Sequence, residues 1–215
     1  MGSTRLPGKI LRRIHTKTLL EHILFRLSRL RSNATTVVAT TSLPKDDPVE
    51  AFCRERGVAC FRGSEKNVLD RYYRCAKHYG FTQIVRLTSD NPFTDIEELD
   101  RLIELHLNNT NDYSHSISWL PVGVGAEIFT FAALEKSVLE GHRPHHLEHV
   151  NEYMLENPDK FKTGILEIRG PKNRPDVRLT VDTEEDYRKV CYIAEAARGE
   201  FVSTEEAIDL CLRFA

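Results

Sequence analysis

Several features that would indicate other classes of protein are scarce or missing in this sequence. The 215 residues include five cysteines, an odd number, and no C-x-x-C pair, which argues against a disulfide framework and against a zinc ribbon. No apolar run approaches the ~18 residues needed to cross a membrane. With 30 basic and 32 acidic side chains, the chain also lacks the basic excess of nucleic-acid-binding domains. We therefore expect a cytoplasmic protein with reduced thiols that binds neither nucleic acid nor membrane.

Three nucleotide-related motifs are also missing. No G-x-G-x-x-G occurs, which disfavours a dinucleotide-dependent oxidoreductase. No D-x-D occurs, although sugar transferases that use a nucleotide and a metal often carry one. The glycine-containing N-terminus is not a Walker A loop, because five residues separate Gly2 from Gly8 and Ile10 follows the lysine.

The sequence does contain a regular alternation of helical and strand-like segments. Apolar residues at helical spacing alternate with short β-branched runs, and the connections between them are short. This pattern predicts an α/β fold with a mainly parallel sheet flanked by helices. We expect helices at 18–30, 49–56, 68–79, 94–107, 131–139, 144–155, 183–198 and from 203 onward, and strands at 35–40, 58–61, 83–87, 112–118, 126–131 and 177–181.

The pattern loosens between residues 112 and 162, but no linker or repeat interrupts the chain. We therefore expect a single domain over residues 1–215, with 112–162 as a subregion of its own. Ligands of α/β sheets bind beyond the carboxyl ends of the strands, so the loops that follow the strands are where chemistry is expected.

The first segment with candidate ligands spans Gly2 to Lys9. It combines two glycines and two hydroxyl side chains with the cations Arg5 and Lys9. Backbone N–H groups turned inward, together with two cations, suit a triphosphate. An ordinary basic N-terminal tail is the alternative interpretation.

Two distant segments share the pattern V-R-L-T-x-D. Val85–Asp90 and Val177–Asp182 each read as a strand that runs out into an aspartate. If both strands lie in one parallel sheet, both aspartates emerge at its carboxyl edge. Mg²⁺ is usually held by one or two carboxylates plus substrate phosphates, so the pair predicts a magnesium site. An Asx-turn at Asp90 and a helix cap at Asp182 are the alternatives.

Two further groups of polar residues are candidate ligands. Arg62 and Ser64 follow a strand and are placed to contact a base or a phosphate. A dense histidine group lies further along the chain, but its spacing does not match the zinc motif H-E-x-x-H. A polar wall for a sugar is favoured over zinc, with a solvated helix face as the alternative. The group consists of His142, His145, His146 and His149, together with Glu148.

Five segments, taken together and in this order, resemble the cytidylyltransferases of the spore-coat-polysaccharide SpsF type, relatives of the CMP-acylneuraminate and CMP-KDO synthetases. The segments are GSTRLPGK, FRGSEKNVLDRYY, RLTSDNP, EHVNEYM and LTVDTEED, which cover nearly the whole chain. The resemblance implies a Rossmann-like nucleotidyltransferase fold. It also implies transfer of CMP from CTP to a sugar, such as a nonulosonate or a related surface-polysaccharide sugar, with release of pyrophosphate.

The resemblance also implies roles for individual residues, with Arg5, Lys9 and Asp90 at the reacting phosphates and Mg²⁺ as the cofactor. A homodimer with 112–162 as its contact region is a further expectation. The implied ligands are Gly2, Ser3, Arg5, Lys9, Arg62, Ser64 and Asp90 for the nucleotide, Asp90 and Asp182 for the metal, and Glu127, Glu148 and His149 for the sugar.

Two departures from the family pattern matter. Members normally carry an apolar strand that ends in alanine-arginine just before the glycine loop, whereas this sequence starts at Met1 inside that motif. The first strand is thus apparently missing, and a gap in the sheet is predicted. A late start, a truncation and a non-catalytic relic are the interpretations that follow. In addition, Gly125 stands where many members carry an acidic residue, which leaves the identity of the sugar open.

Overall fold

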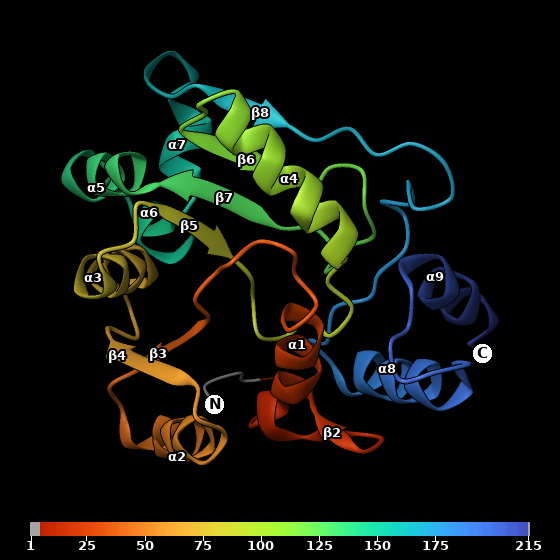
Figure 1. The fold of residues 1–215 in the computed structure, drawn as a ribbon. Helices are drawn as coiled ribbons and strands as arrows, with labels where there is room; N and C mark the ends of the chain where they lie inside the picture. Colours follow the sequence, from red (N-terminus) through yellow and green to blue (C-terminus); the bar gives the residue numbers. More distant parts are fainter. Residues whose placement is uncertain (1–4, 215) are drawn as a thin grey trace.

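The computed structural model describes residues 5–214 and has an α/β architecture (Figure 1). The helices are α1 (Leu19–Leu27), α2 (Asp47–Arg56), α3 (Val68–Tyr79), α4 (Ile96–Asn108), α5 (Phe131–Glu140), α6 (Pro144–Glu148), α7 (Glu152–Glu156), α8 (Glu184–Ala196) and α9 (Thr204–Arg213), with short 3₁₀ helices η1 (Lys9–Leu11), η2 (Pro44–Asp46) and η3 (Pro158–Lys160). The strands are β1 (Arg13–Ile14), β2 (Lys17–Thr18), β3 (Val37–Thr41), β4 (Ala59–Gly63), β5 (Gln83–Arg86), β6 (Tyr113–His115), β7 (Glu127–Thr130) and β8 (Thr163–Ile165).

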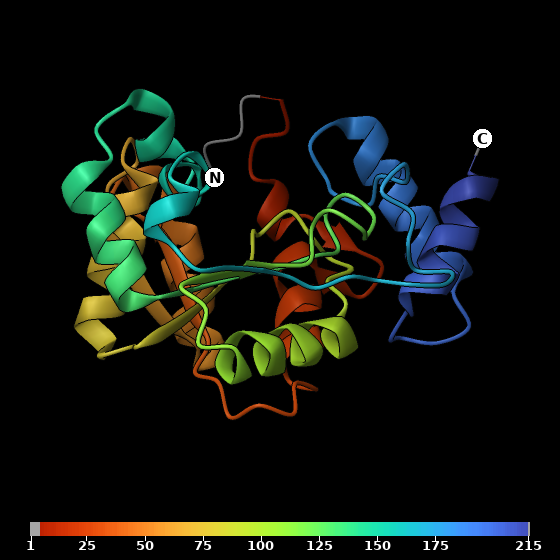
Figure 2. The ribbon, with the colours of Figure 1, turned by 90° about the horizontal axis from the view of Figure 1, so that it is seen from above.

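The strands form a mixed arrangement where a mainly parallel sheet was expected. A four-stranded sheet has the order β5-β7-β6-β8, in which β7 runs antiparallel to both neighbours and β8 runs parallel to β6. β3 and β4 form a separate parallel pair, and β1 and β2 form an antiparallel hairpin. The chain passes from β6 to β7 through a loop without a helix, and such a connection suits antiparallel neighbours. The helix α4 covers one face of the four-stranded sheet (Figures 1 and 2).

Local sequence signals explain where most helices begin. Thr18 caps α1 in a full capping box with Glu21, and Asn67 caps α3. The helix expected from residue 94 begins at Ile96, because its cap is Asp95, whose carboxylate accepts a hydrogen bond from the Glu98 backbone N–H. The single helix expected at 144–155 is interrupted and forms α6 and α7.

The strand expected at 177–181 is also different in the structure. The segment is extended but makes only an isolated parallel bridge, from Arg178 to Val122. The Val122 backbone N–H donates to the Val177 carbonyl at 2.9 Å, and the Leu179 N–H donates to the Val122 carbonyl at 2.8 Å. Two backbone bonds are enough to fix the segment's path without making it a regular strand.

A cavity of about 840 Å³ lies between β3 and β5. Both strands line it, together with apolar side chains of α1 and α4 such as Leu24 and Ile103. Within the described part of the chain, β3 pairs only with β4 and β5 pairs only with β7. The predicted gap in the sheet is therefore present between β3 and β5 in the described part of the chain.

An extended apolar segment in this cavity is expected to stabilise the fold. We expect six β-branched residues, fused ahead of Met1 through a flexible linker, to raise the free energy of unfolding by about 2 kcal/mol, since burial of each aliphatic side chain outweighs part of the ordering cost. Urea unfolding measures this change. A fusion of equal length made of glycine and serine is the control, and equal midpoints for the two fusions would contradict an open strand position.

Candidate nucleotide site

The backbone brings the two matched segments together at their aspartates. The Val181 N–H donates to the Asp90 carbonyl at 2.9 Å, and the Thr180 hydroxyl approaches the same oxygen at 3.4 Å. Asp90 follows the end of β5, and Asp182 lies just before the start of α8. The end of one element and the start of another that is far away in sequence therefore lie close together. The expected meeting of the two aspartates is thus present in the structure.

Lys9 lies between the two aspartates. Its Nζ donates to Asp90 Oδ2 at 2.9 Å, to Asp182 Oδ1 at 3.0 Å and to the Val181 carbonyl at 2.6 Å. Lys9 opens η1, and Gly8 before it has a left-handed backbone with φ of 69°, a conformation that glycine adopts readily. The turn at Gly8 therefore helps to place the lysine against the carboxylates.

Asp182 is surrounded by basic side chains. Arg5 Nη2 lies 3.3 Å from Asp182 Oδ1, and Arg178 pairs with its other oxygen. Burial would raise the pKa of Asp182, but hydrogen bonds and charge from Lys9 and Arg178 outweigh it, so that this pKa is lowered. Asp186 accepts the backbone N–H of Asp182 at 3.1 Å, which fixes the loop ahead of α8.

The two aspartates fit the requirements of a magnesium site. One oxygen of each carboxylate already lies within 3.0 Å of a single shared cation, the Lys9 ammonium. Both carboxylates are partly exposed, so a metal ion and a phosphate can reach them. Hard oxygen ligands from two carboxylates match what Mg²⁺ takes from a protein. Gly2 and Ser3, the other expected phosphate ligands, lie outside the described residues.

Arg62 and Ser64 lie at the carboxyl end of β4, as expected, but Arg62 is already engaged. Its Nη1 lies 2.7 Å from both Asp47 and Glu50, and its Nε donates to the Thr41 carbonyl at 2.9 Å. The guanidinium thus ties β4 to β3 and α2. A contact between Arg62 and the base stays a prediction. In such a contact the base would have to share the guanidinium N–H donors with Asp47, Glu50 and the Thr41 carbonyl.

Two arginines at the site were assigned no ligand role from the sequence. Arg71 lines the large cavity, donates from Nη1 to the Ser64 carbonyl, and has a buried Nε with no hydrogen-bond partner among the described residues. Burial lowers the pKa of its guanidinium. Arg178 pairs with Asp182, and its place in the V-R-L-T-x-D repeat was the signal that could have singled it out.

The expected sugar ligands fall into two environments. Glu127 is buried, where Arg86 pairs with Oε2 and the Tyr113 hydroxyl donates to Oε1 at 2.7 Å. Burial and the neighbouring Glu127 raise the pKa of Tyr113. Glu148 and His149 are exposed at the end of α6 and line the large cavity. Their role in binding a sugar stays a prediction.

The position of Gly125 is sterically restricted. A Cβ built there would lie 2.9 Å from the Ile117 Cα, a backbone atom that cannot simply swing aside. The backbone as it stands thus leaves no room for the acidic side chain that the resemblance leads one to expect.

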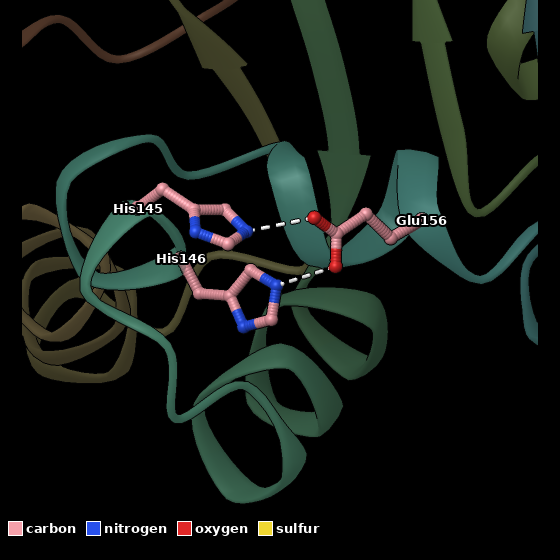
Figure 3. Close-up of side chains that lie close together, drawn as sticks. All are labelled: His145, His146 and Glu156. Carbon is pink, nitrogen blue, oxygen red and sulfur yellow. Dashed lines mark hydrogen bonds and ion pairs between the residues drawn. The ribbon is translucent and has the colours of Figure 1, made fainter.

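The histidine group is organised around a residue that the sequence pattern did not include. Figure 3 shows His145 and His146 pointing at the two oxygens of Glu156, at 2.7 and 2.9 Å. Hydrogen bonds from His146 and His145 lower the pKa of Glu156. The ligand atoms lie within 4.8 Å of one another, as metal ligands can, but each Nε2 is paired with the carboxylate and Arg143 adds a further cation at 3.2 Å. Of the four histidines in the sequence group, only His145 and His146 belong to the cluster with Glu156 in the described part of the chain, and His142 and His149 lie outside it.

Comparison with known proteins places the chain in a family. A family model described as cytidylyltransferase matches residues 1–210. The spore coat polysaccharide biosynthesis protein SpsF of Bacillus subtilis is 35% identical over 219 residues, covering 99% of this chain and 91% of that protein.

Solved structures show the same fold. A cytidylyltransferase from Leptospira borgpetersenii is 34% identical, with a TM-score of 0.91 and coverage of 99% of this chain and 90% of the other. A CMP:2-keto-3-deoxy-manno-octonic acid synthetase in complex with CTP has a TM-score of 0.66 at 19% identity, covering 90% and 94% of the two chains.

Among the described helices, none has both the length and the apolar character needed to span a bilayer.

The nucleotide-diphospho-sugar transferase fold implied by the resemblance is therefore confirmed. Matched over nearly its whole length by the family model and by relatives above 30% identity, the chain belongs to the cytidylyltransferase family.

Proposed function

We propose that the protein transfers CMP from CTP to a sugar hydroxyl and releases pyrophosphate. The observation that carries this proposal is the placement of Lys9 Nζ within 3.0 Å of carboxylate oxygens from both Asp90 and Asp182. Cations and carboxylates that are in contact beyond the carboxyl end of a strand in an α/β fold suit a polyphosphate and its metal ion. Membership of the cytidylyltransferase family supports the nucleotidyl transfer.

In the proposed reaction the oxygen of a sugar hydroxyl bonds to the α-phosphorus, and the bond from that phosphorus to the bridging oxygen of the β-phosphate breaks. The proton of the hydroxyl is released to solvent, and pyrophosphate leaves. Lys9 and Arg5 hold the departing pyrophosphate and offset its negative charge. Mg²⁺ bound by Asp90 and Asp182 would stabilise the charge on the phosphates and lower the pKa of the attacking hydroxyl. The chain's own residues act by positioning and electrostatics, with no covalent intermediate.

The remaining ligands are assigned to the two ends of the substrate pair. We propose Arg62 and Ser64 beside the cytosine and Glu127, Glu148 and His149 beside the sugar. We propose that the sugar is a nonulosonate or a related surface-polysaccharide sugar, and the name of the Bacillus subtilis relative, which refers to spore coat polysaccharide biosynthesis, supports a polysaccharide sugar. We further propose a cytoplasmic location and a homodimer that meets through 112–162, where Ile117, Leu139 and Leu155 are exposed.

A pyrophosphate-release assay tests the proposal. The four nucleoside triphosphates are each combined with a panel of acidic and amino sugars in the presence of Mg²⁺. We expect release with CTP and at least one sugar, and slower release with the other nucleotides. Release only with a purine nucleotide would contradict the assignment.

The open cavity beside β5 favours one alternative, a non-catalytic relic that binds nucleotide or sugar. A relic would bind CTP in calorimetry and release no pyrophosphate with any sugar. The strand fusion separates the two, because restored release in the fusion would show that the site's own residues are competent.

A further inference from the structure

We propose that Lys9 closes the aspartate pair to free divalent cations, so that the metal enters together with a nucleotide whose phosphates take over the lysine. This inference rests on the proposed function and adds an order of binding to it. It concerns Asp90 and Asp182 as they stand without substrate.

The first argument is the number of donors on Lys9. A lysine ammonium has three N–H donors. In the structure these are used by Asp90, Asp182 and the Val181 carbonyl, at 2.9, 3.0 and 2.6 Å. The side chain is only 11% exposed. Lys9 can therefore contact a phosphate only by releasing at least one of these acceptors.

The second argument is the charge around the aspartates. Asp90, Asp182 and Asp186 are the carboxylates of this cluster. Its cations are Lys9, Arg5, Arg178 and Lys189, the last of which lies 3.6 Å from Asp186. The carboxylates are thus already neutralised. A free dication would have to bind beside the ammonium, against like-charge repulsion in a partly buried place.

A triphosphate that enters the site changes the balance of charge around the aspartates. Its negative charge attracts Lys9 and Arg5, whose guanidinium is 65% exposed and free to follow the phosphates. Once the ammonium moves to a phosphate, the Asp90 and Asp182 oxygens that it occupied are available to the metal. The metal and the lysine therefore exchange partners, and neither aspartate is left unpaired during the exchange.

Titration with Mn²⁺ in the absence of nucleotide tests this inference, with free Mn²⁺ measured by electron paramagnetic resonance. We expect Lys9→Met to bind one Mn²⁺ at least about tenfold more tightly than the wild type, a difference of about 1.4 kcal/mol. Lys17→Met is the matched control, because Lys17 pairs with Glu200 away from the site and should leave the affinity unchanged. Lys9→Gln, which keeps a donor without the charge, replaces Lys9→Met if that variant does not fold.

The outcomes separate this inference from the proposed function. Equal Mn²⁺ affinity of the wild type and Lys9→Met, lost in both when Asp182→Asn is added, would overturn the closure by Lys9 while keeping the metal site. No Mn²⁺ binding by Lys9→Met would overturn both. Tighter binding by Lys9→Met that is abolished by Asp182→Asn supports the exchange.

Discussion

Replacing Asp182 with alanine is expected to slow pyrophosphate release by about 10³-fold, mainly through kcat. Loss of one of two carboxylate ligands removes metal-based stabilisation of the phosphate charge, which contributes several kcal/mol to such reactions. The change also frees Lys9 and Arg178, which hold Asp182 in the structure. Steady-state kinetics with saturating CTP measures the effect.

A second single variant, the double variant and a control test the same prediction. Asp90→Ala should cost a similar factor, and the double variant little more than either alone, because residues that act as a unit are not additive. Asp209→Ala, at an exposed aspartate of α9, serves as the control and should retain wild-type kinetics. Wild-type release by both site variants would contradict the metal assignment.

Replacing Glu127 with alanine is expected to lower the free energy of unfolding by about 3–5 kcal/mol, because it leaves the Arg86 charge buried without its partner. The side chains of Glu127 and Arg86 are only 6% and 19% exposed. The Tyr113 hydroxyl would lose its acceptor at the same time. Urea unfolding monitored by circular dichroism measures the loss.

The double variant Arg86→Met, Glu127→Leu is the control for this prediction. Replacing both partners of a buried pair by apolar side chains often restores stability, so the double variant should be more stable than Glu127→Ala. A loss below about 1 kcal/mol for Glu127→Ala, the range of an exposed pair, would contradict the buried network.

Much of the fold could be predicted because local signals agree with the tertiary structure. The helix at 68–79 and the strand at 83–86 occur where periodicity placed them, since a glycine ends the helix and β-branched residues follow. The repeated V-R-L-T-x-D segments predicted the meeting of Asp90 and Asp182. That prediction succeeded because the backbone hydrogen bond from the Val181 N–H to the Asp90 carbonyl aligns the ends of the two segments.

The remaining features depend on long-range contacts that a local pattern does not contain. The antiparallel placement of β7 between β5 and β6 cannot be read from its four residues. Glu156 was not linked to His145 and His146, because the interruption between α6 and α7 turns the chain back on itself. The three hydrogen bonds of Lys9 are long-range as well, because Asp90 and Asp182 lie more than 80 positions from Lys9 in the sequence.

Crystals grown with Mn²⁺ and a non-hydrolysable CTP analogue allow the most direct measurement, the position of the manganese anomalous signal. We predict one peak within coordination distance of carboxylate oxygens from both Asp90 and Asp182, with the Lys9 ammonium moved onto the triphosphate. A nucleotide-bound manganese that contacts neither aspartate, while Lys9 still bridges them, would contradict the account.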